Sequence, residues 1–257
     1  MAKESSILAV IPARYASTRF PGKPLHLIAG KPLVQHVWER VSTARHVSSV
    51  IVATDDDRIA AVARGFGAQV ALTRPDHPTG TDRLAEVAAA HPEATHLINV
   101  QGDEPLIQPG LIDQLASALA ADPDLPMITA AAPLADAVDA HNPNIVKVVL
   151  AADGHEPPRG GQALYFSRSP IPFARGPLIR PCYRHLGIYG YTRNFLLRFV
   201  AWPPSPLEQT ECLEQLRALE NGARIHVVLT TDESPGVDTP EQAQAVEELI
   251  LLASAAR

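Results

Sequence analysis

The sequence has few cysteines and no long apolar run. Cys182 and Cys212 are the only cysteines among 257 residues, so a disulfide framework is excluded. No stretch reaches the roughly 18 consecutive apolar residues that a membrane-spanning helix needs. The apolar run at residues 7–11 is too short to form the core of a secretory signal peptide. We therefore expect a cytoplasmic protein.

An excess of positive charge and the common cofactor motifs are also missing. The formal net charge is −6, which disfavours a general nucleic-acid binder with a basic face. The ten histidines show neither His-x-His nor HExxH spacing, which argues against a zinc enzyme. Neither a Walker phosphate loop nor a GxGxxG dinucleotide fingerprint is present. A nucleotide site, if there is one, must be built in another way.

Short apolar runs alternate with helical patterns in the first half of the chain. The runs that predict buried strands are residues 7–11, 50–53, 69–72 and 96–100. The stretches that predict helices are residues 32–43, 57–66 and 81–90. This alternation implies right-handed β-α-β units and a parallel sheet, with ligands bound beyond the carboxyl ends of the strands. The candidate ligand-binding loops are therefore residues 12–24, 54–57, 73–80 and 101–105.

The second half has a more mixed pattern. The segments that predict strands there are residues 145–150, 163–167, 186–191 and 224–230. Residues 152–161, rich in Pro and Gly, predict a surface excursion. A capping box of Ser205 and Glu208 predicts one helix over residues 205–220, and another capping box at Thr239 predicts the C-terminal helix.

The loop after the first predicted strand carries three cations. Arg14, Arg19 and Lys23 fall in it, and residues 5–38 contain no Asp or Glu although the whole chain is acidic. Small residues that allow close backbone approach, together with these cations, favour a polyphosphate site. The alternative is a solvated basic loop, which an acid-free run of this length disfavours.

Two aspartates are candidates for holding Mg²⁺. Asp103 follows the fourth predicted strand, where a hard cation would find carboxylate oxygens, although a plain Gly-Asp turn is an equally good interpretation. Asp238 precedes the C-terminal helix, but Thr239 already fits the N-cap position. The carboxylate of Asp238 is therefore left without a local task, which favours a metal-ligand role.

Other polar residues are weaker candidates by themselves. Residues 73–83 form a polar loop leading into a helix, which suits a base or ribose but is also what an ordinary capped loop looks like. Arg168, His185 and Glu211 lie near strand ends or on a capped helix, where most such residues are satisfied structural groups.

Taken together, these segments resemble the 3-deoxy-manno-octulosonate (Kdo) cytidylyltransferase family. The matching segments run in family order across almost the whole chain: IPARYASTRFPGKPL (11–25), IVATDD (51–56), TRPDHPTGTDRLAE (73–86), VQGDEP (100–105), NPNIVKVV (142–149), ALYFSRSPIP (163–172), RHLGIYGY (184–191), SPLEQTECLEQLR (205–217) and GVDTPE (236–241). A sialate-activating sibling would share the first loop but not RHLGIYGY or SPLEQTE. Three departures touch the second lobe or the nucleotide loop: TGTDR replaces SGTER, residues 156–160 carry an extra Pro-rich piece, and the segment between SPIP and RHLG is short.

The resemblance implies an α/β, Rossmann-like nucleotide-diphospho-sugar transferase fold with a mixed central sheet and a smaller sugar-binding and dimerisation lobe. It implies one nucleotidyltransferase domain over residues 1–257. The nucleotide-binding half would span about 1–135, the sugar-binding and dimer lobe about 136–222, and a C-terminal strand and helix, 223–257, would return to the main sheet. The family uses Mg²⁺ and works as a cytoplasmic homodimer in lipopolysaccharide synthesis.

The resemblance also implies a role for each candidate residue. The expected reaction joins CTP and Kdo to give CMP-Kdo and pyrophosphate. The catalytic residues would be Lys23, Arg19, Asp103 and Asp238, the last two also as Mg²⁺ ligands. The CTP site would comprise Ala13, Arg14, Arg19, Lys23, Arg74, Thr79, Gly80, Thr81 and Arg83. The Kdo site would comprise Gln101, Arg168, His185, Tyr189 and Glu211.

Three rival functions remain at this point. One is a related enzyme that joins CTP to another acidic sugar, sialate-like or a modified Kdo. The second is an NAD-dependent oxidoreductase, against which the missing glycine fingerprint counts. The third is a non-catalytic nucleotide-binding protein, which would have no need for both aspartates and all three loop cations.

Overall fold

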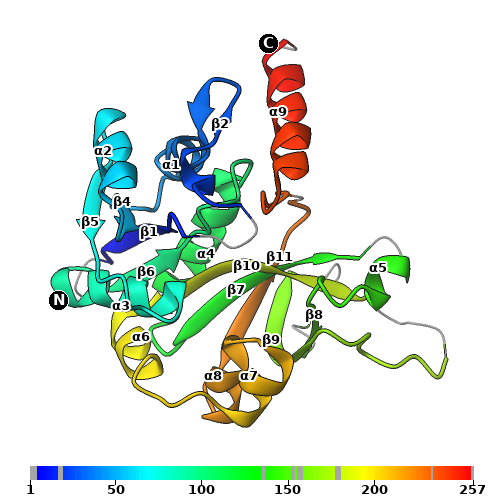
Figure 1. Ribbon diagram of the computed structural model, residues 1–257. Coiled ribbons are helices and arrows are strands. Elements are labelled where there is room, and N and C mark those ends of the chain that lie inside the picture. The colour runs from blue at the N-terminus through cyan, green and yellow to red at the C-terminus, as the bar shows by residue number, and fades with distance from the viewer. Residues whose placement is uncertain are drawn as a thin grey trace.

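The computed structural model describes residues 5–16, 20–134, 137–151, 154, 159–176, 181–232 and 234–255. Within them, one sheet has the strand order β5-β4-β1-β6-β10-β7-β11-β9-β8 (Figure 1). The strands are β1 (Ile7–Ala13), β4 (Ser49–Thr54), β5 (Gln69–Leu72), β6 (His96–Asn99), β7 (Met127–Pro133), β8 (Lys147–Leu150), β9 (Gly160–Ser167), β10 (Tyr183–Thr192) and β11 (Ile225–Leu229).

The strands and helices predicted for the first half are present, whereas the helix at Pro109–Ala121 and strand β7 were not predicted. Strands β5, β4, β1 and β6 are parallel, and helices α1 (Leu33–Val41), α2 (Asp57–Gly65) and α3 (Gly80–Ala90) connect this part of the chain. Asp56 caps α2 through the backbone N–H of Arg58, and Thr79 with Asp82 forms a capping box on α3. The carboxyl ends of these strands therefore share one edge of the sheet.

The second half inserts an antiparallel strand into the same sheet. Strand β10 pairs antiparallel with both β6 and β7, while β11 pairs parallel with β7. The predicted strands of this half are present, with β9 and β10 both longer than expected. Of the predicted surface excursion, residues 152, 153 and 155–158 lie outside the described residues, and Gly160 already belongs to β9.

The single helix expected over residues 205–220 is wrong. Two short helices, α7 (Pro206–Glu211) and α8 (Gln215–Glu220), replace it. Cys212 ends α7 in the left-handed conformation at φ 52°, which a helix cannot continue through. The next residue, Leu213, is buried in the core, so packing decides the break rather than a glycine or proline signal.

Helices cover both faces of the sheet (Figure 1). One core cluster joins the sheet to α1, α2 and α4 (Pro109–Ala121), and a second joins it to α3, α6 (Arg193–Phe199) and α8. Both clusters consist largely of fully buried Val, Ile, Leu and Ala, whose removal from water is the main stabilising contribution. The two layers hold the strands rigidly, so the loops at the carboxyl edge start from fixed points.

The C-terminal helix α9 (Pro240–Ala255) stands out from the sheet (Figure 1). Its first turns pack Ala243 and Val246 against Ile28 of the small hairpin β2 (Leu27–Ile28) and β3 (Lys31–Pro32). Glu247 accepts a hydrogen bond from the backbone N–H of Ala29 at 2.7 Å. Neither α9 nor any other helix in the described part of the chain is both long and apolar enough to cross a membrane.

Candidate active site

Lys23 joins the two aspartates that the sequence nominates. Its Nζ lies 2.7 Å from Oδ2 of Asp103 and 3.0 Å from Oδ1 of Asp238. Lys23 opens the short helix η1 (Lys23–Leu25), Asp103 follows β6, and Asp238 precedes α9. Residues far apart in the chain thus form one charged cluster at the carboxyl edge of the sheet, where ligands of such sheets bind.

Backbone contacts fix the loops that carry this cluster. The N–H of Val237 donates to the carbonyl of Asp103 at 2.8 Å, which ties the last loop to the loop after β6. Gly102 lies so close to β1 that a Cβ there would sit 2.6 Å from the carbonyl oxygen of Pro12. Only glycine fits at that approach, so the glycine of the GDEP motif positions Asp103.

The loop after β1 and the loop at residues 73–80, before α3, are bound to each other. Arg14 Nη2 donates to the carbonyls of His77 and Thr79, each at 2.8 Å. Gly80, the first residue of α3, lies against Pro12. Ala13 is buried at the end of β1, so only its backbone faces the edge. Arg19, a proposed catalytic residue, lies outside the described residues.

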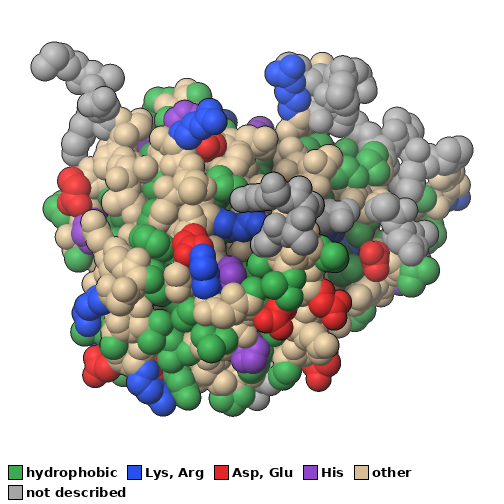
Figure 2. All heavy atoms as spheres, turned by 90° about the horizontal axis from the view of Figure 1, so that it is seen from above, with side chains coloured by type: hydrophobic (Ala, Val, Ile, Leu, Met, Phe, Trp, Pro, Cys, Tyr) green, Lys and Arg blue, Asp and Glu red, His purple; other side chains and the backbone are tan. Residues whose placement is uncertain are grey.

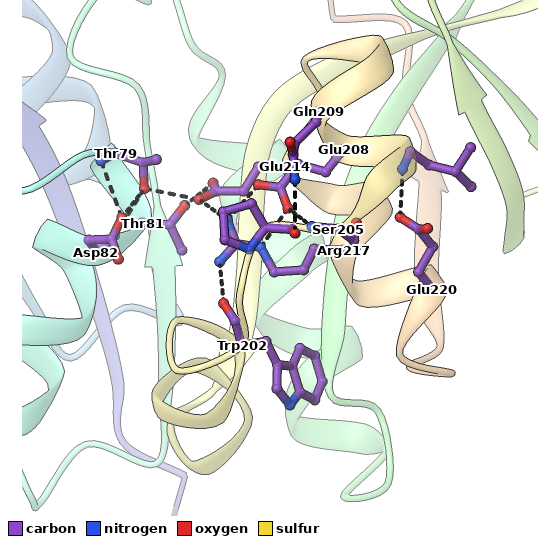
Figure 3. Close-up of polar contacts among 12 residues, drawn as sticks. Thr79, Thr81, Asp82, Trp202, Ser205, Glu208, Gln209, Glu214, Arg217 and Glu220 are labelled. Carbon is purple, nitrogen blue, oxygen red and sulfur yellow. Dashed lines mark hydrogen bonds and ion pairs between the residues drawn. The ribbon is translucent and has the colours of Figure 1, made fainter.

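Thr79 and Thr81 contact a carboxylate that the sequence analysis did not nominate. Their hydroxyl oxygens lie 2.9 and 2.5 Å from Oε1 and Oε2 of Glu214, and Figure 3 shows this contact crossing from α3 to the α7–α8 segment. Burial raises the pKa of Glu214, while the two hydroxyl hydrogen bonds and the charge of Arg217 act to lower it. The start of α3 is thus attached to the α7–α8 segment.

Arg217 extends this network away from α3. Its Nε and Nη2 donate to the Glu208 carboxylate at 2.7 and 2.5 Å, and Oε2 of Glu208 accepts from the N–H of Ser205 (Figure 3). Glu208 therefore forms the predicted capping box with Ser205 and also pairs with the nearly buried guanidinium of Arg217. The helix pair α7–α8 is fixed by these contacts.

Arg83, which the sequence analysis assigned to CTP, has a buried side chain, so the predicted contact would require that side chain to turn outward. The side chain is fully buried; its Nη2 pairs with Oδ1 of Asp55 at 3.1 Å, and its Nη1 contacts the hydroxyl of Thr73. Burial lowers the pKa of Arg83, and the Asp55 carboxylate opposes that shift. Arg83 holds the loops after β4 and β5 from beneath. Arg74, by contrast, is largely exposed and lies 3.6 Å from Asp76.

Three of the proposed sugar residues lie on or next to β10. Gln101 Nε2 donates to the carbonyl of Gly187 at 3.0 Å. His185 Nε2 lies 3.0 Å from the hydroxyl of Thr129, and its ring is 5.3 Å from that of Tyr189. Burial lowers the pKa of His185 to about 3 and raises that of Tyr189. His185 is therefore a neutral ring near neutral pH.

Arg168 and Glu211 are already engaged with each other's backbone. Arg168 Nε donates to the carbonyl of Glu211 at 2.8 Å, and its Nη1 donates to that of Pro143 at 2.9 Å. The Glu211 carboxylate accepts from Ser167 Oγ at 2.6 Å and from the N–H of Arg168 at 2.9 Å. Their assignment to Kdo stays a prediction. A bound sugar must either leave these contacts in place or replace them with contacts of its own.

A buried lysine and a half-buried glutamate near the site escaped the sequence analysis. Lys147 is fully buried and donates to the carbonyls of Asn142, Ile145 and Arg168 at 2.9, 2.7 and 2.5 Å. Burial, with the charges of Asp103 and Asp232, raises the pKa of Glu104 to about 8. Both residues stand in the quoted NPNIVKVV and VQGDEP segments, but residue type alone does not reveal which way a side chain points.

The face above the sheet carries mixed charges. Figure 2 shows acidic, basic and histidine side chains interspersed there, rather than a broad patch of one sign. In the part of the chain that the structure describes, no group of three or more His, Cys, Asp or Glu side chains is arranged to hold a metal ion. A metal at Asp103 and Asp238 would therefore take its remaining ligands from water and substrate.

Comparison with known proteins decides the family. Residues 8–225 match the cytidylyltransferase family. The chain is 53% identical to the 3-deoxy-manno-octulosonate cytidylyltransferase of Geobacter sulfurreducens over 256 residues, covering 95% of this chain and 98% of that protein. It is 51% identical to the corresponding protein of Pseudomonas syringae pv. tomato, over 96% and 98% of the two chains. The chain belongs to the 3-deoxy-manno-octulosonate cytidylyltransferase family. Its enzyme class is that of a nucleotidyltransferase.

Solved structures support the same assignment. A CMP:2-keto-3-deoxy-manno-octonic acid synthetase complexed with CTP superposes with a TM-score of 0.91 at 42% identity, covering 97% of this chain and all of that one. A cytidylyltransferase from Leptospira borgpetersenii, at 16% identity and a TM-score of 0.63, shares the fold. The mixed-sheet nucleotidyltransferase fold expected from the family resemblance is confirmed.

Proposed function

We propose that this chain transfers the cytidylyl group of CTP to Kdo, giving CMP-Kdo and pyrophosphate for lipopolysaccharide synthesis. The observation that carries this is the cluster of Lys23, Asp103 and Asp238 at the carboxyl edge of the sheet, in a chain about half identical to Kdo cytidylyltransferases. A nucleotidyl transfer needs cationic groups and a metal site at that edge to bind the triphosphate. An NAD-dependent oxidoreductase would not need this arrangement there.

The anomeric hydroxyl of Kdo loses its proton to water and attacks the α-phosphorus of CTP, and the bond from that phosphorus to the oxygen bridging to the β-phosphate breaks as pyrophosphate leaves. Negative charge grows on the phosphate oxygens, so catalysis consists of positioning and electrostatic stabilisation. Lys23 and Arg19 are proposed to bind the triphosphate and stabilise the leaving group. Arg14 also holds the nucleotide loop through two carbonyls. The cytidine is proposed to lie beside Arg74, Thr79, Gly80 and Thr81.

The residues present fit Mg²⁺. Asp103 and Asp238 place two carboxylate oxygens within 3.0 Å of one point, the Nζ of Lys23, and both side chains are about one-third exposed. Mg²⁺ is usually held by one or two carboxylates with waters and substrate phosphate. When bound there, the ion supplies charge neutralisation at the α-phosphate and lowers the pKa of a coordinated hydroxyl.

The sugar is proposed to bind over β10 and the α7–α8 segment. Gln101, His185 and Tyr189 line that part of the sheet, and Arg168 and Glu211 join it to α7. A neutral His185 can donate or accept a hydrogen bond with sugar hydroxyls without adding charge. Arg168 is proposed to pair with the Kdo carboxylate, for which a planar guanidinium is suited.

A homodimer in the cytoplasm is part of the proposal. The second lobe exposes large apolar side chains, Leu164 at 57% and Phe173 at 86%. Exposed apolar groups of this size, close in sequence to the sugar residues, suit a surface covered by a second copy. Sedimentation of the purified protein will measure its mass in solution.

The decisive test measures pyrophosphate release from four nucleoside triphosphates crossed with a panel of acidic sugars. We expect release only with CTP and Kdo, and its loss in Asp103→Asn. Turnover with CTP and a sialate or a modified Kdo, at a higher kcat/KM than with Kdo, would establish the alternative sugar. Binding of CTP without release in any combination would establish the non-catalytic alternative.

A further inference from the structure

Lys23 occupies the place between the two proposed metal ligands. Its ammonium group contacts one carboxylate oxygen from each aspartate and is only 14% exposed. The contact is built by the fold, because Gly22 in the left-handed conformation turns the chain into η1 and donates its N–H to the carbonyl of Tyr15 at 2.9 Å. The backbone bond between Val237 and Asp103 holds the two acidic loops together around it.

Two like charges held this close need a compensating cation. In the free protein Lys23 supplies it, since each aspartate then has a partner at hydrogen-bond distance. The same two oxygens are those offered to a divalent cation. An ammonium group and a divalent cation of higher charge cannot both lie between them without strong repulsion.

Lys23 is also the proposed ligand of the triphosphate. A triphosphate carries several negative charges and competes with the aspartates for the ammonium group. We propose that Lys23 is an internal counter-ion that occupies the divalent-cation position in the free protein and leaves it when a triphosphate binds. Nucleotide and divalent cation then load together, and the cation alone binds weakly. This inference rests on the proposed metal site of the cytidylyl transfer.

The test measures Mn²⁺ affinity without nucleotide, by electron paramagnetic resonance of the free ion. Mn²⁺ accepts the same oxygen ligands as Mg²⁺. We expect Lys23→Met to bind Mn²⁺ about tenfold or more tightly than the natural protein, the change expected on removing one adjacent positive charge. Adding Asp103→Asn to that variant is expected to abolish the gain. The matched control is Lys31→Met, which removes an equal charge from the exposed pair with Glu39 and should leave Mn²⁺ affinity unchanged.

The outcomes separate the inference from the metal site itself. Equal Mn²⁺ affinity in the natural protein and Lys23→Met, lost in both with Asp103→Asn, overturns the counter-ion role and leaves the metal site standing. A Mn²⁺ affinity that Asp103→Asn leaves unchanged overturns the proposed metal site. No measurable binding to Lys23→Met also overturns the counter-ion role. Since both aspartates stay partly hydrated, Lys23→Met is expected to fold, and circular dichroism checks this. Lys23→Gln removes the same charge and serves as a second variant if Lys23→Met does not fold.

Discussion

The buried pair of Arg83 and Asp55 allows a sharp test of the role predicted for Arg83 at the CTP site. Arg83 is fully buried, whereas Asp55 keeps 21% of its side chain exposed. Asp55→Ala leaves a guanidinium in the core without its carboxylate, and loss of one partner of a buried pair costs about 3–5 kcal/mol of the free energy of unfolding. Arg83→Met leaves a carboxylate that water still reaches. Its cost should be about 1–2 kcal/mol, mainly the lost contact with Thr73.

Thermal unfolding followed by circular dichroism measures both costs. At this chain length 1 kcal/mol corresponds to about 2 °C in Tm, so we expect a drop of roughly 6–10 °C for Asp55→Ala and roughly 2–4 °C for Arg83→Met. The double variant should resemble Arg83→Met, because the unpaired buried charge is gone. Lys31→Met, which breaks the exposed pair with Glu39, should shift Tm by less than about 2 °C.

Michaelis constants complete the test. If Arg83 holds loops rather than nucleotide, Arg83→Met should change the KM for CTP no more than it changes that for Kdo. An Arg83→Met protein with the natural Tm but a KM for CTP raised more than tenfold would show that the side chain contacts nucleotide. It would restore the assignment made from the sequence. An unchanged Tm in Asp55→Ala would contradict the buried-pair energetics.

Three further predictions follow from the site. Asp103→Asn and Asp238→Asn should each reduce pyrophosphate release by about 10²-fold or more with little change in Tm, and the double variant should cost about as much as one; additive losses would mean that the two do not serve one ion. Lys147→Met should raise the KM for Kdo more than that for CTP, because its ammonium holds the backbone of Arg168; equal rises would make it a general structural residue. His185→Gln should flatten the pH dependence of Tm below pH 6.5. Burial lowers the pKa of His185 to about 3 from 6.5, so protonation favours the unfolded chain, and the stability due to the neutral ring is lost as pH falls below 6.5. Parallel Tm curves between pH 4 and 8 would contradict this.

Much of the first half of the chain could be predicted because its signals are local. A short apolar run between helical patterns identifies a strand without knowledge of its neighbours. The right-handed crossover rule then brings the carboxyl ends of β1, β4 and β6 to one edge. Asp103 and the loop of Arg14 and Lys23 were placed at that edge by this reasoning, and the structure puts them there.

The second half was harder because its pairings are not local. Strand β10 pairs with β6 and β7, which lie far from it in the sequence. The hydrophobic pattern of a strand does not indicate which distant strand it pairs with. The helix predicted over residues 205–220 from its capping box is interrupted at Cys212, whose left-handed φ of 52° directly precedes the buried Leu213. Local propensity gave way to packing.

The sequence by itself determined the family, the parallel half of the sheet and the kinds of side chain at its edge. Each of these depends on residue type and order along a short segment. Only the tertiary structure decided what each charge faces: Lys23 toward two aspartates, Arg83 toward Asp55 in the core, and Glu214 toward Thr79 and Thr81. The physical reason is that the interaction of a charged side chain depends on how far away its partner lies and how deeply both are buried. Both quantities are set by packing between segments that the sequence keeps far apart.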